Sequence, residues 1–149
     1  MDSYRALKSS KQGTLRLPDV VSNGGTNMGK RVLLVEDEPN IIEAITFLLS
    51  REGWQVETHV DGATAVERVK AVQPDLLMLD HMLPGKSGLD ILTELRSEDQ
   101  FATLPILMLT ARGQMRDRAQ AEAAGVSRFM TKPFSNTEVL AAVRDLTRL

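Results

Sequence analysis

The sequence predicts a three-layer α/β sandwich in which five parallel strands alternate with five helices. Short apolar runs without polar alternation are typical of strands that are covered on both faces, and segments with apolar residues at helical spacing lie between these runs. The expected strands are 32–35, 55–59, 76–79, 104–109 and 128–130. This alternation favours right-handed crossovers and places a ligand site at the carboxyl ends of the strands.

The first half of this pattern contains two strand-to-helix units. Pro39 suits the first position of a helix whose apolar stripe ends at Gly53. The polar run 55–59 is typical of an edge strand, and Asp61 is a suitable N-cap for the second helix. The fully apolar strand 76–79 follows, so we expect it near the centre of the sheet.

In the second half, two serine–acid pairs mark helix starts. Ser87 with Asp90 and Ser135 with Glu138 have the spacing of a capping box. The segment 114–124 is rich in alanine and charge and holds a single large apolar residue. It can form a helix but can bury little, so we expect it to dock weakly and to move. A solvated surface helix without any such role explains the same composition.

The composition is that of one ordinary soluble domain. The chain has 149 residues, 18 Lys+Arg against 20 Asp+Glu, and no Cys. The lack of cysteine excludes a disulfide framework, a cysteine zinc site and a cysteine nucleophile. The near-neutral charge argues against direct nucleic-acid binding, and no apolar stretch suits a membrane span or signal peptide. We therefore expect no nucleic-acid or membrane partner and a cytoplasmic location.

The first residues differ from the rest of the chain. Residues 1–27 are polar, end in a run of Ser, Asn, Gly and Thr, and show no sustained period. We expect them to form a flexible N-terminal extension without a function of its own, and the folded domain to cover 28–149. Met28 is a candidate natural start, because it directly precedes the first apolar run.

Three carboxylates, a hydroxyl and an amine follow the expected strands and should meet at one edge of the sheet. They are Glu36, Asp37, Asp80, Thr110 and Lys132. Two carboxylates about 4 Å apart repel by roughly 4 kcal/mol at an effective dielectric constant near 20, so this group needs a cation or raised pKa values. Oxygen ligands without His or Cys favour Mg²⁺. Such an ion would keep Asp80 ionised as a phosphoryl acceptor. Helix capping explains one of these acids but not the set.

Four segments carry a family resemblance. They are VLLVEDEPN (32–40), DLLMLDHMLPGKSG (75–88), PILMLTAR (105–112) and RFMTKPF (128–134). With these segments, the sequence resembles the receiver domain of two-component response regulators, in particular the stand-alone receivers of chemotaxis, over residues 30–149. The resemblance implies a flavodoxin-like sheet with the strand order 2-1-3-4-5.

The resemblance assigns the acidic residues to phosphoryl acceptance and metal binding. It implies that Asp80 accepts a phosphoryl group from a sensor histidine kinase or a phosphotransfer protein. It also implies that Asp37, Asp80 and the main-chain carbonyl of Met82 ligate Mg²⁺, and that Glu36 helps through a water molecule.

The same resemblance gives roles to residues of the last two strands. It implies that Thr110 and Lys132 hold the phosphoryl oxygens and that the peptide bond before Pro133 is cis. Phe129 would be the switch aromatic that turns inward as Thr110 moves. The lysine is a compact point charge suited to a phosphoryl oxygen, and the small Ala111 leaves room for the group.

Two neighbours of the expected site should set how long the phosphoryl group lasts. Met82 and Arg112 lie two residues beyond Asp80 and Thr110, at positions where family members differ. A bulky apolar side chain and a guanidinium at these positions should hinder the attacking water. We therefore expect slow dephosphorylation.

The expected function is that of a single-domain response regulator, because the sequence ends with its last helix. We expect no enzyme beyond Mg²⁺-dependent self-phosphorylation and autodephosphorylation. The output would be a phosphorylation-dependent surface on the fourth helix, fifth strand and fifth helix that binds an unidentified downstream protein. A phosphate sink and a phosphorylation-independent interaction module remain as alternatives.

Other readings of the site fit the sequence less well. An aspartate-nucleophile phosphatase needs a second acid at the position of Met82, and no glycine-rich phosphate loop for a nucleotide follows any expected strand.

The residues before the fifth strand, 125–128, lack the acidic loop of DNA-binding members that dimerise through this face. We therefore expect a monomer or a weak dimer.

Overall fold

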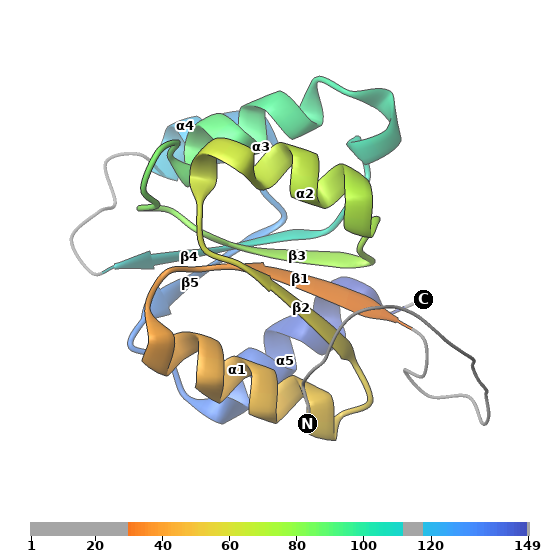
Figure 1. Ribbon diagram of the computed structural model, residues 1–149, viewed down its shortest axis with the longest axis vertical. Helices are drawn as coiled ribbons and strands as arrows, with labels where there is room; N and C mark the ends of the chain where they lie inside the picture. Colours follow the sequence, from red (N-terminus) through yellow and green to blue (C-terminus); the bar gives the residue numbers. More distant parts are fainter. Residues whose placement is uncertain (1–29, 112–117, 149) are drawn as a thin grey trace.

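The computed structural model describes residues 30–111 and 118–148, which form an α/β sandwich (Figure 1). Its sheet has five parallel strands in the order β2-β1-β3-β4-β5. This confirms the predicted fold class and strand order. The strands are β1 (Arg31–Val35), β2 (Gln55–His59), β3 (Leu76–Asp80), β4 (Ile106–Ala111) and β5 (Arg128–Lys132).

Helices cover both faces of the sheet (Figure 1). The helices α1 (Pro39–Arg51) and α5 (Asn136–Thr147) pack on one face. The other face carries α2 (Ala65–Val72), α3 (Gly88–Arg96) and α4 (Arg118–Ala124). Two short 3₁₀ turns, η1 (Gly62–Thr64) and η2 (Asp99–Phe101), precede α2 and β4.

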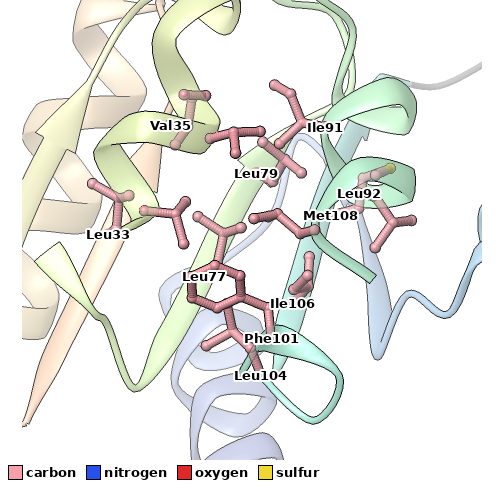
Figure 2. Packing of buried hydrophobic residues seen from close by; sticks show 14 of the residues in the cluster. Leu33, Val35, Leu77, Leu79, Ile91, Leu92, Phe101, Leu104, Ile106 and Met108 are labelled. Atoms are coloured by element: carbon pink, nitrogen blue, oxygen red, sulfur yellow. The ribbon is translucent and has the colours of Figure 1, made fainter. Parts of the chain in front are cut away.

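The core consists of two apolar layers, one on each face of the sheet. Successive side chains of a strand point to opposite faces, so Leu33 and Leu77 join the layer beneath α2 and α3, whereas Leu34 and Met78 join the layer beneath α1 and α5. Figure 2 shows the first layer, in which Leu77 and its neighbours on β3 and β4 face α3. Both layers are fully buried at these positions. Burial on both faces explains why the central strands are continuous apolar runs.

Side-chain caps start the helices near the residues that the sequence predicts. Ser135 and Glu138 form a complete capping box, with bonds of 3.1 and 2.7 Å. The Ser87 hydroxyl accepts the Asp90 N–H over 3.1 Å. Asp61 accepts the amide two residues further on and therefore caps the turn η1, not α2 itself as expected.

The ends of four predicted strands differ from the structure, by one residue at β1 and β3 and by two residues at β4 and β5. The fourth strand begins at Ile106 rather than at residue 104 and continues to Ala111. Pro105 has no N–H to donate to the sheet, although its carbonyl accepts the Leu77 N–H over 3.0 Å. The fifth strand continues to Lys132, which brings its side chain to the sheet edge.

The weakly apolar segment predicted as a helix over 114–124 is helical where it is described. The helix α4 has seven residues, of which only Ala121 is buried. Residues 114–117 and the expected extension 1–27 lie outside the described residues. Within 30–111 and 118–148, no helix has both the length and the apolar character that crossing a membrane requires.

Candidate functional site

The carboxyl edge of the sheet carries the candidate site. Glu36 and Asp37 directly follow β1, and Asp80 is the last residue of β3. Thr110 lies near the end of β4, and Lys132 is the last residue of β5. Parallel strands end at the same edge, so four separate segments contribute polar groups to one place, as the sequence predicts.

Three carboxylates form a cluster at this edge. Oxygen atoms of Glu36, Asp37 and Asp80 all lie within 4.8 Å of one another. Glu36 is 0% exposed and Asp80 is 4% exposed, whereas Asp37 is open to solvent. The cluster is therefore half enclosed, with one accessible carboxylate at its mouth.

The buried Glu36 carboxylate is only partly satisfied by hydrogen bonds. Its Oε2 atom accepts the N–H of Asp37 over 3.2 Å and that of Glu38 over 3.0 Å. Its Oε1 atom has no hydrogen-bond partner of suitable geometry, although the Lys132 Nζ lies 3.1 Å away as an ion-pair partner. An all-oxygen cluster with an incompletely bonded buried oxygen fits a hard cation such as Mg²⁺.

The pKa values of the two buried acids are raised. Burial is the main cause at Glu36, where the charge of Asp80 adds to it and a backbone hydrogen bond opposes it. Burial also raises the pKa of Asp80, and the charge of Lys132 opposes this effect most strongly. Ionisation of both carboxylates therefore costs free energy, and a nearby cation lowers this cost.

Lys132 is that nearby cation. Its Nζ lies 3.0 Å from Glu38 Oε1, 3.1 Å from Glu36 Oε1 and 3.3 Å from Asp80 Oδ1. Burial lowers the pKa of Lys132, but its hydrogen bond to Glu38 and the charges of Asp80 and Glu36 outweigh burial, so the pKa is raised. The ammonium group stays charged and joins β5 to β1 and β3.

Glu38 is the site residue that our sequence reasoning missed. Its carboxylate is the closest acceptor of the lysine ammonium, although the side chain is 58% exposed. It is also the residue before α1, whose N-cap it occupies without a side-chain hydrogen bond. The signal in the sequence was the unbroken acidic run 36–38 at the end of the first strand.

Thr110 lies at the expected place, with its hydroxyl turned to its own strand. The residue is 5% exposed, and its Oγ1 donates a hydrogen bond to the Ala111 carbonyl over 3.0 Å. The register pairs Asp80 with Leu109 and Thr110 with Thr131. The threonine therefore lies one residue beyond the position opposite the acidic side chain.

Phe129 lies on β5, half-buried against the apolar layer that includes Ala121 of α4. The guanidinium carbon of Arg118 lies 4.8 Å from the centre of the phenylalanine ring. This is a cation–π contact between α4 and β5. It joins the expected switch aromatic to α4, which has the fewest buried residues of the described α-helices.

Met82 is 57% exposed and follows Asp80 by two residues in the loop between β3 and α3. Its N–H donates to Asp80 Oδ1 over 3.3 Å, which places the Met82 backbone beside the acidic cluster. The Lys132–Pro133 peptide bond is cis, as the resemblance implies. Arg112 lies outside the described residues.

A protein-family model identifies the family to which the chain belongs. The family model described as "Response regulator receiver domain" matches residues 32–144. This chain belongs to the response regulator receiver family. It is accordingly a receiver domain of a two-component system and not a classical enzyme.

Relatives of this receiver are named as regulators of transcription. The chain is 40% identical to the transcriptional regulatory protein TrcR of Mycobacterium tuberculosis over 149 residues, which cover 99% of the chain and 56% of that relative. It is 39% identical to the phosphate regulon transcriptional regulatory protein PhoB of Escherichia coli over 121 residues, which cover 81% of the chain and 53% of that relative. The receiver therefore spans about half the length of these curated relatives.

A solved structure with magnesium in its active-site cleft is similar to this receiver. It is the receiver domain of the sensor histidine kinase PA1611 from Pseudomonas aeruginosa. The TM-score is 0.73 at 29% sequence identity, and the match covers 80% of this chain and 98% of that chain. The cluster of Glu36, Asp37 and Asp80 is typical of a receiver Mg²⁺ site.

Proposed function

We propose that this receiver accepts a phosphoryl group on Asp80 from a phosphohistidine of a sensor histidine kinase or a phosphotransfer protein. The observation that carries the proposal is the position of the Asp80 carboxylate. It is buried at the strand edge, within 4.8 Å of two further carboxylates and 3.3 Å from the Lys132 ammonium. An acceptor carboxylate needs this combination of an adjacent metal site and a fixed cation.

The metal part of the proposal assigns Mg²⁺ to the acidic cluster. Asp37, Asp80 and the Met82 carbonyl would hold the ion, and Glu36 would act through water. When bound, Mg²⁺ would neutralise charge on the acceptor and on the incoming phosphoryl oxygens. The three carboxylate oxygens within 4.8 Å of one another support a cation at this place.

The chain's own groups would then carry the transfer. An Asp80 carboxylate oxygen forms the bond to phosphorus as the P–N bond of the phosphohistidine breaks, and the electron pair goes to the imidazole nitrogen. Lys132 exchanges its Glu38 contact for a phosphoryl oxygen, since an ammonium is a point charge with three donors. The Thr110 hydroxyl leaves the Ala111 carbonyl to donate to another phosphoryl oxygen. Phe129 turns inward as Thr110 moves.

We propose a slow return to the unphosphorylated state. Met82 is 57% exposed and its N–H bonds to Asp80, so its bulk beside the acceptor would hinder an attacking water. Arg112 would act with it.

The output of the proposed switch is a protein-binding surface formed by α4, β5 and α5. The contact of Arg118 with Phe129 supports it, because movement of the ring changes a contact on α4. Phosphorylation shifts the equilibrium between two states only by its unequal interaction with them. In this proposal, the receiver acts in the cytoplasm on an unidentified protein, as a monomer or a weak dimer.

A second candidate output is the control of transcription. It is favoured by the curated relatives, which are named as transcriptional regulators and of which this receiver matches about half. The acceptor chemistry at Asp80 is the same in both candidates. A phosphate sink would share that chemistry, whereas a phosphorylation-independent module would lack it.

The experiment that tests the proposal is the intact mass of the protein after incubation with acetyl phosphate, with and without Mg²⁺. The expected result is a Mg²⁺-dependent gain of one phosphoryl group that the Asp80→Asn variant does not show. An unchanged mass in the presence of both reagents, or an equal gain by the variant, would contradict acceptance at Asp80.

A further inference from the structure

The turn between β2 and α2 lies directly against the loop between β3 and α3. The Gly62 N–H of η1 donates to the Pro84 carbonyl over 2.9 Å. Gly62 is buried, although both segments are loops at the carboxyl edge of the sheet. A backbone hydrogen bond between two loops fixes their separation more closely than a contact between flexible side chains.

No side chain fits between the two segments at this point. A Cβ atom on Gly62 would lie 2.1 Å from the Lys86 carbonyl oxygen and 2.9 Å from the Pro84 carbonyl oxygen. These are backbone atoms, so they cannot rotate away, and the loop itself would have to move. Glycine is required here for close approach of two backbones.

The facing loop presents a glycine to the same contact. Gly85 has a φ of +87°, and a Cβ atom there would lie 3.0 Å from Asp61 Oδ1 and 3.0 Å from the Ala63 amide nitrogen. The contact between the turn and the loop therefore depends on glycine from both sides.

The loop held in this way carries the backbone of the expected metal site. At its start, the Met82 N–H bonds to Asp80. At its end, the Gly88 N–H donates to the His81 carbonyl over 2.9 Å. The bond from Gly62 to Pro84 holds the middle of the loop, between these two fixed ends.

We propose that Gly62 is a positioning residue that fixes the β3–α3 loop and thereby sets the Mg²⁺ affinity of the site. The inference rests on the proposed function, because it takes the Met82 carbonyl as a ligand. Mg²⁺ requires near-ideal octahedral geometry with bonds of about 2.0–2.1 Å. A loop displaced by the clash at Gly62 presents its carbonyl in the wrong place, while the carboxylates that follow β1 and end β3 stay where they are.

The test compares Gly62→Ala with Gly125→Ala, by isothermal titration with Mg²⁺ and by thermal melting. Gly125 precedes β5 at the opposite end of the strands, has a φ of +100°, and faces the Arg96 side chain. Its substitution should lower the melting temperature and leave the Mg²⁺ dissociation constant unchanged. Gly62→Ala should weaken Mg²⁺ binding by about tenfold or more, as loss of an outer-shell partner of a metal typically does.

A folded Gly62→Ala protein that binds Mg²⁺ as tightly as the wild type would overturn the inference, as would equal weakening by both variants. A wild type that does not bind Mg²⁺ would instead remove the metal part of the proposed function and the inference with it.

If Gly62→Ala does not fold, two variants of Asp61 test the inference instead. Asp61 accepts the Ala63 N–H over 3.2 Å and the Thr64 hydroxyl over 3.0 Å, and asparagine retains the capping acceptor whereas alanine removes it. Asp61→Ala should weaken Mg²⁺ binding a few-fold more than Asp61→Asn. Equal affinity of these two variants would overturn the inference.

Discussion

The Nζ of Lys132 lies closer to Glu38 Oε1, at 3.0 Å, than to Asp80 Oδ1, at 3.3 Å. Glu38 is 58% exposed, whereas Asp80 is almost fully buried. The lysine is therefore shared between a solvent-exposed carboxylate and the buried acidic cluster. In the proposed transfer, the lysine exchanges this exposed partner for a phosphoryl oxygen.

Removal of the Glu38 charge should favour phosphorylation by small anionic donors. An exposed ion pair is worth about 0–1 kcal/mol, so we expect Glu38→Gln to speed phosphorylation by acetyl phosphate a few-fold at saturating Mg²⁺. The matched control is Glu43→Gln, which makes the same charge change at an exposed position of α1. Initial rates measured by intact mass check the prediction, and equal rates for both variants would contradict it.

Replacement of Lys132 should destabilise the metal-free protein. Loss of one partner from a buried ion pair typically costs about 3–5 kcal/mol. The Lys132 side chain is 17% exposed, so we expect Lys132→Met to lower the free energy of unfolding by less, about 1–3 kcal/mol. Mg²⁺ should restore part of this loss.

Lys70→Met is the control for that measurement. Lys70 forms an exposed pair with Glu98 over 3.1 Å, and such a pair contributes about 0–1 kcal/mol. Urea unfolding with and without Mg²⁺ compares the two variants. Equal losses in the two variants would show that Lys132 does not neutralise the cluster.

The raised pKa of Asp80 gives a prediction for stability against pH. Burial raises this pKa, so the folded state binds the proton more tightly than the unfolded state does. The resulting stability is present at pH values below the ordinary pKa of aspartate and is lost as the pH rises through the folded-state pKa. At neutral pH without divalent cations, Asp80→Asn should therefore be more stable than the wild type.

The difference should shrink as the pH falls and the wild-type carboxyl becomes protonated. Urea unfolding in EDTA, at several pH values from neutral to acidic, measures this difference in the free energy of unfolding. An Asp80→Asn protein that is less stable than the wild type at neutral pH would show that the contacts of the charged form exceed the cost of its burial.

The lifetime of the phosphoryl group should depend on Met82 and Arg112. We expect that replacing both residues by serine admits the attacking water and speeds dephosphorylation several-fold. The decay of the phosphorylated protein, followed by intact mass after removal of the donor, gives the rate. Val60→Ser is the control, because Val60 is a similarly exposed apolar residue, 53% exposed, outside the β3–α3 loop. An unchanged rate in the double variant would remove these residues from control of the lifetime.

The sequence predicted the fold well because burial on both faces leaves a simple pattern. Leu77 and Met78 are adjacent in β3 and are buried in opposite layers, so a central strand needs apolar residues at every position. The polar β2 lies at the edge of the sheet, as expected for a strand of this composition. Strand ends then determined where the acidic residues, Thr110 and Lys132 would meet.

The orientation of side chains within the site could not be predicted in the same way. Spacing places Thr110 at the edge, but the rotamer that bonds its hydroxyl to Ala111 depends on local geometry. The reach of Lys132 to Glu38 depends on a flexible side chain that crosses from β5 to β1. Close approach at Gly62 depends on two loops that are distant in sequence.

The central claim is that Asp80 is the acceptor, and the most direct measurement is to locate the modified residue. Borohydride reduces an aspartyl phosphate to homoserine, which peptide mass spectrometry assigns to a position in the chain. After treatment with acetyl phosphate and Mg²⁺, the account predicts homoserine at position 80 and unmodified Asp37. Modification at Asp37, or no reducible acyl phosphate in a phosphorylated protein, would contradict it.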